Sequence, residues 1–221
     1  YNIEDLTFEK QEEIYSNPEK YSTKNLDIAT LRDARIGIHE FVLECQIAAI
    51  KDAGYRPSTS REVGTVGLTL DPATTSMLVN EKTPGVYRYE GREISSEKLI
   101  KIYAKWVEKY PIISIEDGLS ENDWDGWMNL IERLGDKVLL IGDDLLVTQG
   151  ARLMKLITML EEKGFVDKET GKITKKLGIL IKLNQNGFLT TGINAPAKGY
   201  LGTIEVIRLA KMYGFEIVVS H

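Results

Sequence analysis

Acidic residues follow three successive apolar runs in this sequence, and a lysine and a histidine end the next two. The acidic residues are Asp71, Glu116 and Asp143, and the later runs end at Lys182 and His221. One acidic residue after a strand is usually a helix cap or a turn residue. The prediction of a functional site therefore depends on the occurrence of such residues after several successive strands. Carboxylates without a cluster of cysteine or histidine suit a hard cation, Mg²⁺ before Zn²⁺. The pattern predicts a Mg²⁺ site formed by Asp71, Glu116 and Asp143.

Two of these positions are doubled, because Asp117 follows Glu116 and Asp144 follows Asp143. Successive residues of a strand face opposite sides, so only one member of each pair can point into a shared site. We assign Glu116 and Asp143 to the site, and we expect the other member of each pair to cap a helix or to support the ligands.

Lys182 lies late in the apolar run 177–183. Poor solvation would lower the pKa of its ammonium group and make Lys182 a general base. A lysine there could equally reach solvent or pair with Asp143, and residue type leaves both roles open. His221 is a candidate for a proton or anion contact.

These residues need elements that bring strand ends together. The five apolar runs are continuous rather than alternating, which is typical of strands covered on both faces in a parallel sheet. The predicted strands are 66–70, 112–115, 138–141, 179–181 and 217–219. The amphipathic segments between or before them predict helices at about 33–53, 96–109, 122–134, 149–162 and 202–213.

Strands that alternate with helices indicate an α/β protein, either an open doubly wound sheet or a closed barrel. Candidate functional residues at every strand end favour a TIM-type (β/α) barrel, whose strand ends converge on one face. Five predicted strands are fewer than the eight of that barrel, so we expect an incomplete barrel over residues 33–221. We interpret residues 1–32 as a polar lead-in or linker, loop-rich over 1–30.

Three stretches interrupt the regular pattern. Residues 71–93 form a long predicted loop with a small hairpin at 86–89. The charged stretch 163–176 predicts a solvent-facing hairpin. The stretch 190–200, punctuated by glycine and proline, predicts a loop near the site.

Composition limits the classes of partner. The chain has 221 residues and a net charge of −5, which argues against a general nucleic-acid binder. No apolar run reaches the length of about 18 residues that a membrane span needs. The single Cys45 excludes an internal disulfide framework and favours a reducing compartment, so we expect a cytoplasmic protein that binds neither nucleic acid nor membrane.

Several strings, in order and spacing, resemble the C-terminal barrel of enolases. They are Tyr-Pro-Ile-Ile-Ser-Ile-Glu-Asp-Gly-Leu at 110–119, Asn-Asp-Trp-Asp-Gly-Trp at 122–127, Gly-Asp-Asp-Leu at 142–145, Ile-Lys-Leu-Asn-Gln at 181–185 and Val-Val-Ser-His at 218–221. The resemblance implies a glycolytic lyase that reversibly dehydrates 2-phosphoglycerate, a small phosphorylated carboxylate, to phosphoenolpyruvate.

The resemblance also implies residue roles. Asp71, Glu116 and Asp143 would be the Mg²⁺ ligands, Lys182 would take the proton from C2 of the substrate, and His221 would contact the substrate. It further implies a homodimer or membership of a larger assembly.

The sequence departs from the enolase pattern in places. It contains no Gly-Asp-Glu-Gly-Gly motif, whose glutamate takes part in expelling the hydroxide, and it reads Pro-Ala-Thr-Thr-Ser-Met at 72–77, after the first acidic residue. The alternative to an active enolase is therefore a catalytically impaired, enolase-like protein with a structural or scaffolding role. A superfamily lyase acting on another carboxylate is a third alternative.

Overall fold

The computed structural model describes residues 8–182 and 202–220. The chain forms two compact units, one of residues 1–68 and 108–111 and one of residues 69–107 and 112–221. The predicted loop at 190–200 and His221 lie outside the described residues.

The first unit is mainly helical. Its elements are α1 (Phe8–Ser16), α2 (Pro18–Tyr21), α3 (Ile28–Asp33), α4 (Ile38–Asp52) and the short parallel strands β1 (Arg56–Pro57) and β2 (Thr65–Val66). Ile14, Tyr15, Ile28 and Phe41 form its buried cluster. The ring of Tyr15 meets that of Phe41 edge to face at 5.6 Å.

These helices correct two expectations. The loop-rich interpretation of residues 1–30 is wrong for its described part, because short helices there are held by shared core contacts and caps such as Asp27, which accepts a hydrogen bond from the Thr30 amide. The helix expected from residue 33 begins instead at Ile38. Arg35 has a φ of 52°, a left-handed conformation that separates α3 from α4. A domain boundary near residue 32 stays a prediction.

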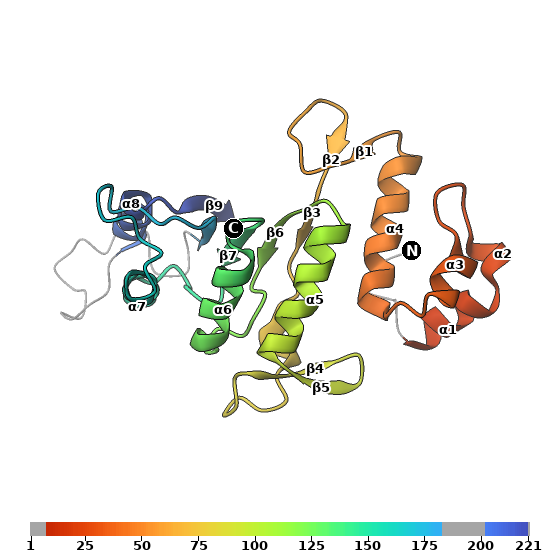
Figure 1. The fold of residues 1–221 in the computed structure, drawn as a ribbon, viewed down its shortest axis with the longest axis horizontal. Helices are drawn as coiled ribbons and strands as arrows, with labels where there is room; N and C mark the ends of the chain where they lie inside the picture. The colour runs from red at the N-terminus through yellow and green to blue at the C-terminus, as the bar shows by residue number, and fades with distance from the viewer. Residues whose placement is uncertain (1–7, 183–201, 221) are drawn as a thin grey trace. The chain divides into compact units, whose positions relative to one another are not determined.

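The second unit contains a five-stranded sheet (Figure 1). Its strands are β3 (Leu68–Leu70), β6 (Ile112–Glu116), β7 (Leu139–Gly142), β8 (Leu177–Lys182) and β9 (Glu216–Ser220), in the spatial order β3-β6-β7-β8-β9. The four strands from β6 to β9 pair in parallel.

The order of these strands decides between the two predicted architectures. Each strand lies beside the next one along the chain, apart from a separate hairpin, so the order never reverses. A doubly wound sheet reverses at its switch point, whereas a (β/α) barrel adds strands in sequence. The described strands do not close on themselves, as expected for an incomplete barrel.

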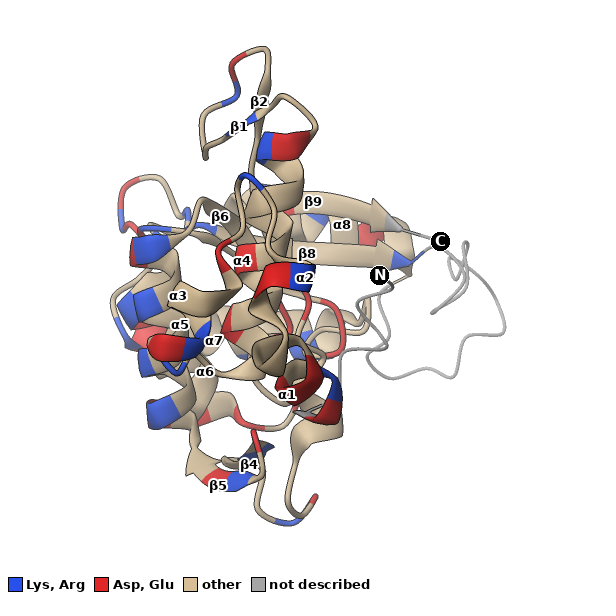
Figure 2. Ribbon diagram, turned by 90° about the vertical axis from the view of Figure 1, so that its right-hand side faces the viewer, with Lys and Arg blue, Asp and Glu red and all other residues tan. Residues whose placement is uncertain are grey.

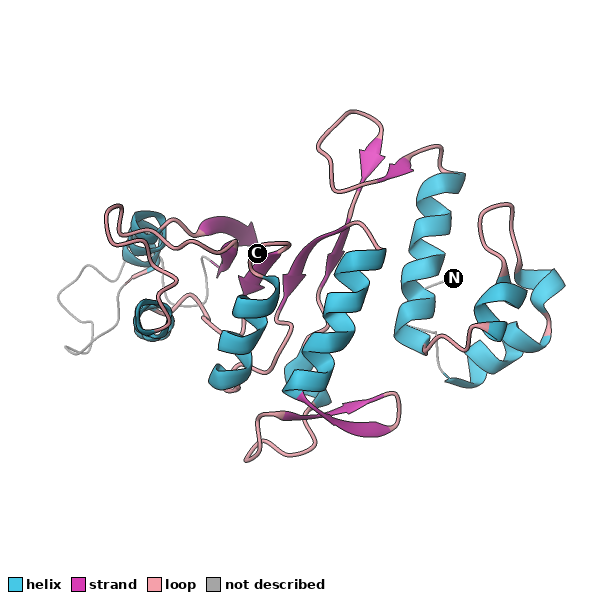
Figure 3. Cartoon of the chain, viewed as in Figure 1, coloured by secondary structure: helices cyan, strands magenta, loops and turns pink. Residues whose placement is uncertain are grey.

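Four helices alternate with these strands (Figure 3). They are α5 (Ser96–Lys109), α6 (Trp124–Leu134), α7 (Gly150–Glu162) and α8 (Thr203–Tyr213), close to their predicted positions. In α6, Trp127, Leu130, Ile131 and Leu134 are fully buried at the three- and four-residue spacing of one helix face. This spacing explains why the helices were readable from the sequence.

The hairpin predicted within 163–176 is confirmed, whereas the one predicted at 86–89 extends to residue 95, because residues 86–89 form only its first strand. β4 (Val86–Tyr89) pairs antiparallel with β5 (Arg92–Ser95). In the stretch 163–176, an antiparallel bridge joins Val166 to Ile173, and Asp167 accepts hydrogen bonds from Thr170 within the turn. The long loop predicted after residue 70 contains one turn of 3₁₀ helix, η2 (Thr74–Met77).

Acidic and basic residues are interspersed along the helices and loops (Figure 2). Within the described residues, no helix combines the length and the apolar character needed to cross a membrane.

Candidate metal and proton-transfer site

The carboxyl ends of the central strands bring three predicted site residues to one edge of the sheet. Glu116 ends β6, Asp143 follows β7 directly, and Lys182 ends β8. These strands are parallel and adjacent, so their ends lie side by side. Carboxylate oxygens of Glu116, Asp117 and Asp143 all lie within 4.8 Å of one another.

Asp143 is the member of this group that pairs with a lysine. Its side chain pairs with Lys182, whose Nζ lies 2.5 Å from Oδ2. Asp143 is only 7% exposed, and its Oδ1 is buried without a hydrogen-bond partner among the described residues. Burying a carboxylate oxygen without a partner is costly, so this oxygen is suited to receive a cation or a donor from a ligand.

Asp117 has a different role from its neighbours in the cluster. Its Oδ1 accepts hydrogen bonds from the amides of Asp143 and Leu145, and its Oδ2 accepts one from the amide of Asp144. Both oxygens are therefore engaged by the backbone after β7. Although it is close enough to be a ligand, Asp117 is better suited to hold the Asp143 segment in place, as expected for the second member of its pair.

Asp71 does not join the compact group. It is exposed, and its Oδ1 accepts a hydrogen bond from the amide of Ala73 at 3.2 Å. The structure thus brings Glu116 and Asp143 together and leaves Asp71 at the margin, although its charge still acts on Glu116. The role of Asp71 as a third ligand stays a prediction.

The carboxylates repel one another. Burial raises the pKa of Glu116 to about 7, and the charges of Asp71, Asp117 and Asp143 add to this effect. Burial also raises the pKa of Asp117 to about 6, against the lowering effect of its backbone hydrogen bonds. A site that concentrates negative charge in this way is stabilised by a bound cation.

The two roles left open for Lys182 differ in the direction in which its pKa moves. Poor solvation alone would lower the pKa of the ammonium group, and pairing with Asp143 would raise it. The hydrogen bond to Asp143 has the largest effect and raises this pKa, because it stabilises the charged form by more than burial destabilises it. Lys182 is thus a protonated partner of Asp143, the role that residue type had left open.

The residues present fit a hard divalent cation. Glu116 and Asp143 supply oxygen ligands only, and the Oδ1 of Asp143 is already buried and free of hydrogen bonds from described residues. Mg²⁺ prefers such oxygen ligands and retains several water molecules, so two or three carboxylates suffice.

Residues 34–221 match the family model described as enolase, C-terminal TIM barrel domain. The chain belongs to this enolase family. The match covers all five strands of the sheet and every predicted site residue, and it agrees with the TIM-barrel fold class inferred from strand order. Membership indicates enolase-superfamily lyase chemistry.

The enolase barrel contains supporting residues that sequence reasoning missed. Thr148 accepts a hydrogen bond from the Lys182 amide at 3.1 Å. The guanidinium of Arg152 donates to the carbonyl oxygens of Leu145 and Glu121, which belong to the loops after β7 and β6. In the sequence, Thr148 is marked only as a polar residue between the acidic strand end and the next helix. Arg152 lies within a helical pattern and is not marked in any way.

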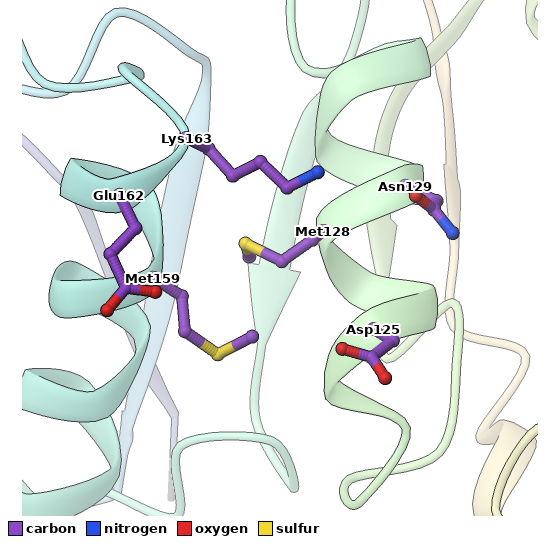
Figure 4. Close-up of a pocket in the computed structure, with 6 residues that line it drawn as sticks. All are labelled: Asp125, Met128, Asn129, Met159, Glu162 and Lys163. Carbon is purple, nitrogen blue, oxygen red and sulfur yellow. The ribbon is translucent and has the colours of Figure 1, made fainter.

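A separate pocket of about 430 Å³ lies between α6 and α7 (Figure 4). Its lining is Asp125, Met128, Asn129, Met159, Glu162 and Lys163. These residues come from the helices rather than from the strand ends, so the pocket is distinct from the carboxylate cluster. His221, the remaining predicted site residue, lies outside the described residues.

Proposed function

We propose that this enolase-family chain is a Mg²⁺-dependent lyase that reversibly dehydrates 2-phosphoglycerate to phosphoenolpyruvate in glycolysis. The observation that carries this proposal is the ion pair between Lys182 and Asp143, beside the carboxylate of Glu116, at the ends of adjacent parallel strands. A lysine base working with divalent cations is the known scheme of the enolase superfamily.

Glu116 and Asp143 bind the cation in this proposal, with Asp71 as the third ligand. When bound, Mg²⁺ supplies positive charge that offsets the second negative charge that develops on the substrate carboxylate. Asp117 keeps Asp143 in position through the backbone amides after β7. His221 contacts the substrate.

Lys182 moves the proton. In the forward direction its neutral amine takes the proton from C2, and the C2–H electron pair delocalises onto the substrate carboxylate. Return of that pair forms the C2=C3 double bond as the C3–oxygen bond breaks. In the reverse direction its ammonium group returns that proton to C2. The ion pair with Asp143 stabilises the protonated form, so Lys182 must leave that contact before it acts as a base.

The hydroxide that departs from C3 needs a proton to leave as water. The enolase motif that carries this acid, Gly-Asp-Glu-Gly-Gly, does not occur in these 221 residues. This departure supports a second candidate, a catalytically impaired enolase-like protein with a scaffolding role. Loss of the acid would lower the rate by about 10²–10⁴-fold, which separates the two candidates.

The test is formation of phosphoenolpyruvate from 2-phosphoglycerate with Mg²⁺ present, followed by absorbance of the enol double bond. We expect the wild-type chain to be active and Lys182→Ala to lose at least about 10³-fold. Lys168→Ala is the matched control, because Lys168 is an exposed lysine in the hairpin. Activity of the wild type no higher than that of Lys182→Ala would reject the lyase and favour the scaffold.

We further propose that the protein is cytoplasmic and acts as a homodimer or as part of a larger assembly. Light scattering after size-exclusion chromatography tests the dimer, and a monomer at micromolar concentration would contradict it.

A further inference from the structure

We propose that Thr148 is a positioning residue that sets the place of the Lys182 amine by binding the Lys182 backbone amide. The proposal rests on the proposed function of Lys182 and adds a residue to it. Thr148 lies in the loop between β7 and α7 and is fully buried. Its Oγ1 accepts the hydrogen bond of the Lys182 amide at 3.1 Å.

The hydroxyl takes the place of a missing strand partner. The last residue pair between β7 and β8 joins Gly142 to Ile179, so β7 ends before β8 reaches Lys182. On its other side, β8 continues to pair with β9 as far as Lys182 and Ser220. The amide of Lys182 would lack a ladder acceptor from β7, and Thr148 supplies one from the loop that follows.

The same loop contains Asp143, so the hydrogen bond between Thr148 and Lys182 completes a closed series of contacts among these three residues. The carbonyl oxygen of Asp143 accepts hydrogen bonds from the amides of Leu146 and Val147, which folds the chain into a turn. Thr148 leaves this turn and binds the backbone of Lys182. The side chain of Lys182 returns to Asp143. Asp143, the proposed metal ligand, and Lys182, the proposed base, are therefore linked to one another through Thr148.

The backbone at this position is strained. Val147 and Thr148 have φ angles of 41° and 51°, in the left-handed region that β-branched residues rarely adopt. Such conformations persist where the surrounding contacts determine them, and they cluster at functional sites. A glycine or asparagine would adopt this backbone with less strain, but neither offers a hydroxyl at that point.

Asp117 and Arg152 bind other parts of the loop, and Thr148 binds the Lys182 amide. Asp117 binds the amides of residues 143–145, and Arg152 binds the carbonyl oxygen of Leu145. Within the described part of the chain, neither side chain binds the backbone of Lys182. Loss of the Thr148 hydroxyl should thus disturb Lys182 more than the acidic cluster.

The test compares Thr148→Val with Thr148→Ser. Valine keeps the size, the β-branch and the backbone strain but removes the acceptor, whereas serine keeps the acceptor. Thr158→Val is a matched control on α7, where an exposed threonine bonds only within its helix. Three quantities are measured in the full chain: exchange of the Lys182 amide hydrogen by NMR, the Mg²⁺-induced rise in melting temperature, and exchange of the substrate C2 proton with solvent deuterium.

We expect Thr148→Val to speed exchange of the Lys182 amide at least about 10-fold and to slow C2 proton exchange at least about 10-fold, with the Mg²⁺ shift retained. Thr148→Ser and Thr158→Val should stay within about threefold of wild type in both exchange rates. Unchanged Lys182 amide exchange in Thr148→Val, or equal losses in the serine and valine variants, would overturn the proposal.

The outcomes also separate this inference from the proposed function. If the wild type shows no exchange of the substrate C2 proton, the proposed lyase function is rejected. The exchange rate of the Lys182 amide then tests the contact with Thr148 by itself. If Thr148→Val does not fold, the protection of the Lys182 amide from hydrogen exchange in the wild type becomes the test. A Lys182 amide that exchanges as fast as that of an unstructured peptide contradicts the contact, and a protected amide that Thr148→Ser preserves supports it.

Discussion

Asp143 shows how one residue can join two functions. One of its oxygens holds the ammonium group of Lys182, and the other is buried without a hydrogen-bond partner among the described residues. In the proposed mechanism, this pair therefore links the protonation state of Lys182 to the occupancy of the cation site. Any change at Asp143 affects both, so the predictions at this scale use Glu116 instead.

Mg²⁺ should stabilise the wild-type chain, because the proposed cation site exists only where folding brings the carboxylates together. At a concentration about 100 times the dissociation constant, the gain is about 2.7 kcal/mol, and the melting temperature should rise by about 5 °C or more. Glu116→Gln should abolish this shift. Asp136→Asn, at an exposed carboxylate paired with Lys175, should retain it. The measurement is thermal unfolding with Mg²⁺ and with EDTA, and equal shifts in both variants would refute the site.

Stability without a cation should depend on pH through Glu116. Its pKa is raised from 4.5 to about 7 on folding, so the folded state holds more protons than the unfolded state between these values. The free energy of unfolding should therefore fall as pH rises through this window, by about 1 kcal/mol after allowance for partial exposure.

Glu116→Gln should lack this dependence. Urea unfolding in EDTA at about pH 5 and pH 8 measures it. The variant should gain stability relative to wild type at the higher pH. A constant difference between the two proteins at both pH values would show that the Glu116 pKa is not raised.

At the scale of elements, Asp123 links the β4–β5 hairpin to the start of α6. Its side chain accepts hydrogen bonds from the Tyr87 hydroxyl at 2.8 Å, from the Ser96 hydroxyl at 2.5 Å and from the Gly126 amide at 3.1 Å. The Tyr87 hydroxyl in turn accepts a hydrogen bond from the Ser120 amide. Asp123 is thus both a helix cap and a buried connection between two elements.

Asp123→Ala should therefore destabilise the protein strongly, by about 3 kcal/mol, because it removes a cap and leaves buried donors without an acceptor. Tyr87→Phe should cost about 2 kcal/mol through the loss of its two contacts. Glu132→Ala, at an exposed acidic residue of α6, should change stability by less than about 0.5 kcal/mol. Urea midpoints measure all three, and an Asp123→Ala loss no greater than that of Glu132→Ala would contradict the role.

The sequence allowed most of these elements to be predicted, and physical reasons explain the exceptions. α5 was predicted with its observed bounds because its buried residues repeat at helical spacing. The helices of residues 8–33 were missed because they are short and depend on contacts between Ile14, Ile28 and Phe41. Among site residues, Glu116, Asp143 and Lys182 were visible as polar ends of apolar runs. The supporting role of Asp117 was expected from its place beside Glu116, whereas Thr148 acts on the backbone of another strand, which no spacing reveals.

At the scale of the whole sheet, the outer strands differ from the central ones. Within the described residues, β9 has one neighbour, β8, and Val219 on β9 is 61% exposed. β8 is buried along nearly its whole length. The stability of backbone hydrogen bonds should therefore decline from the middle of the sheet to its edges.

Hydrogen exchange should show this gradient. We expect the amides of β7 and β8 to exchange slowest and those of β3 and β9 at least about 10-fold faster, because edge strands open without disrupting a second ladder. Mass spectrometry of peptides from the full chain measures the order. Amides of β9 as slow as those of β8 would contradict the prediction and reveal a further strand paired with β9.

The sequential strand order has a consequence for how the molecule is made. Because every strand of the five-stranded sheet pairs with the preceding strand of that sheet, the sheet can grow during synthesis in the order in which its strands are made. The acidic residues emerge from the ribosome before Lys182 does. A nascent chain that ends in the 163–176 hairpin thus carries Glu116, Asp117 and Asp143 together without their lysine counter-charge, and a divalent cation in the cell would stabilise that folding intermediate most at this stage.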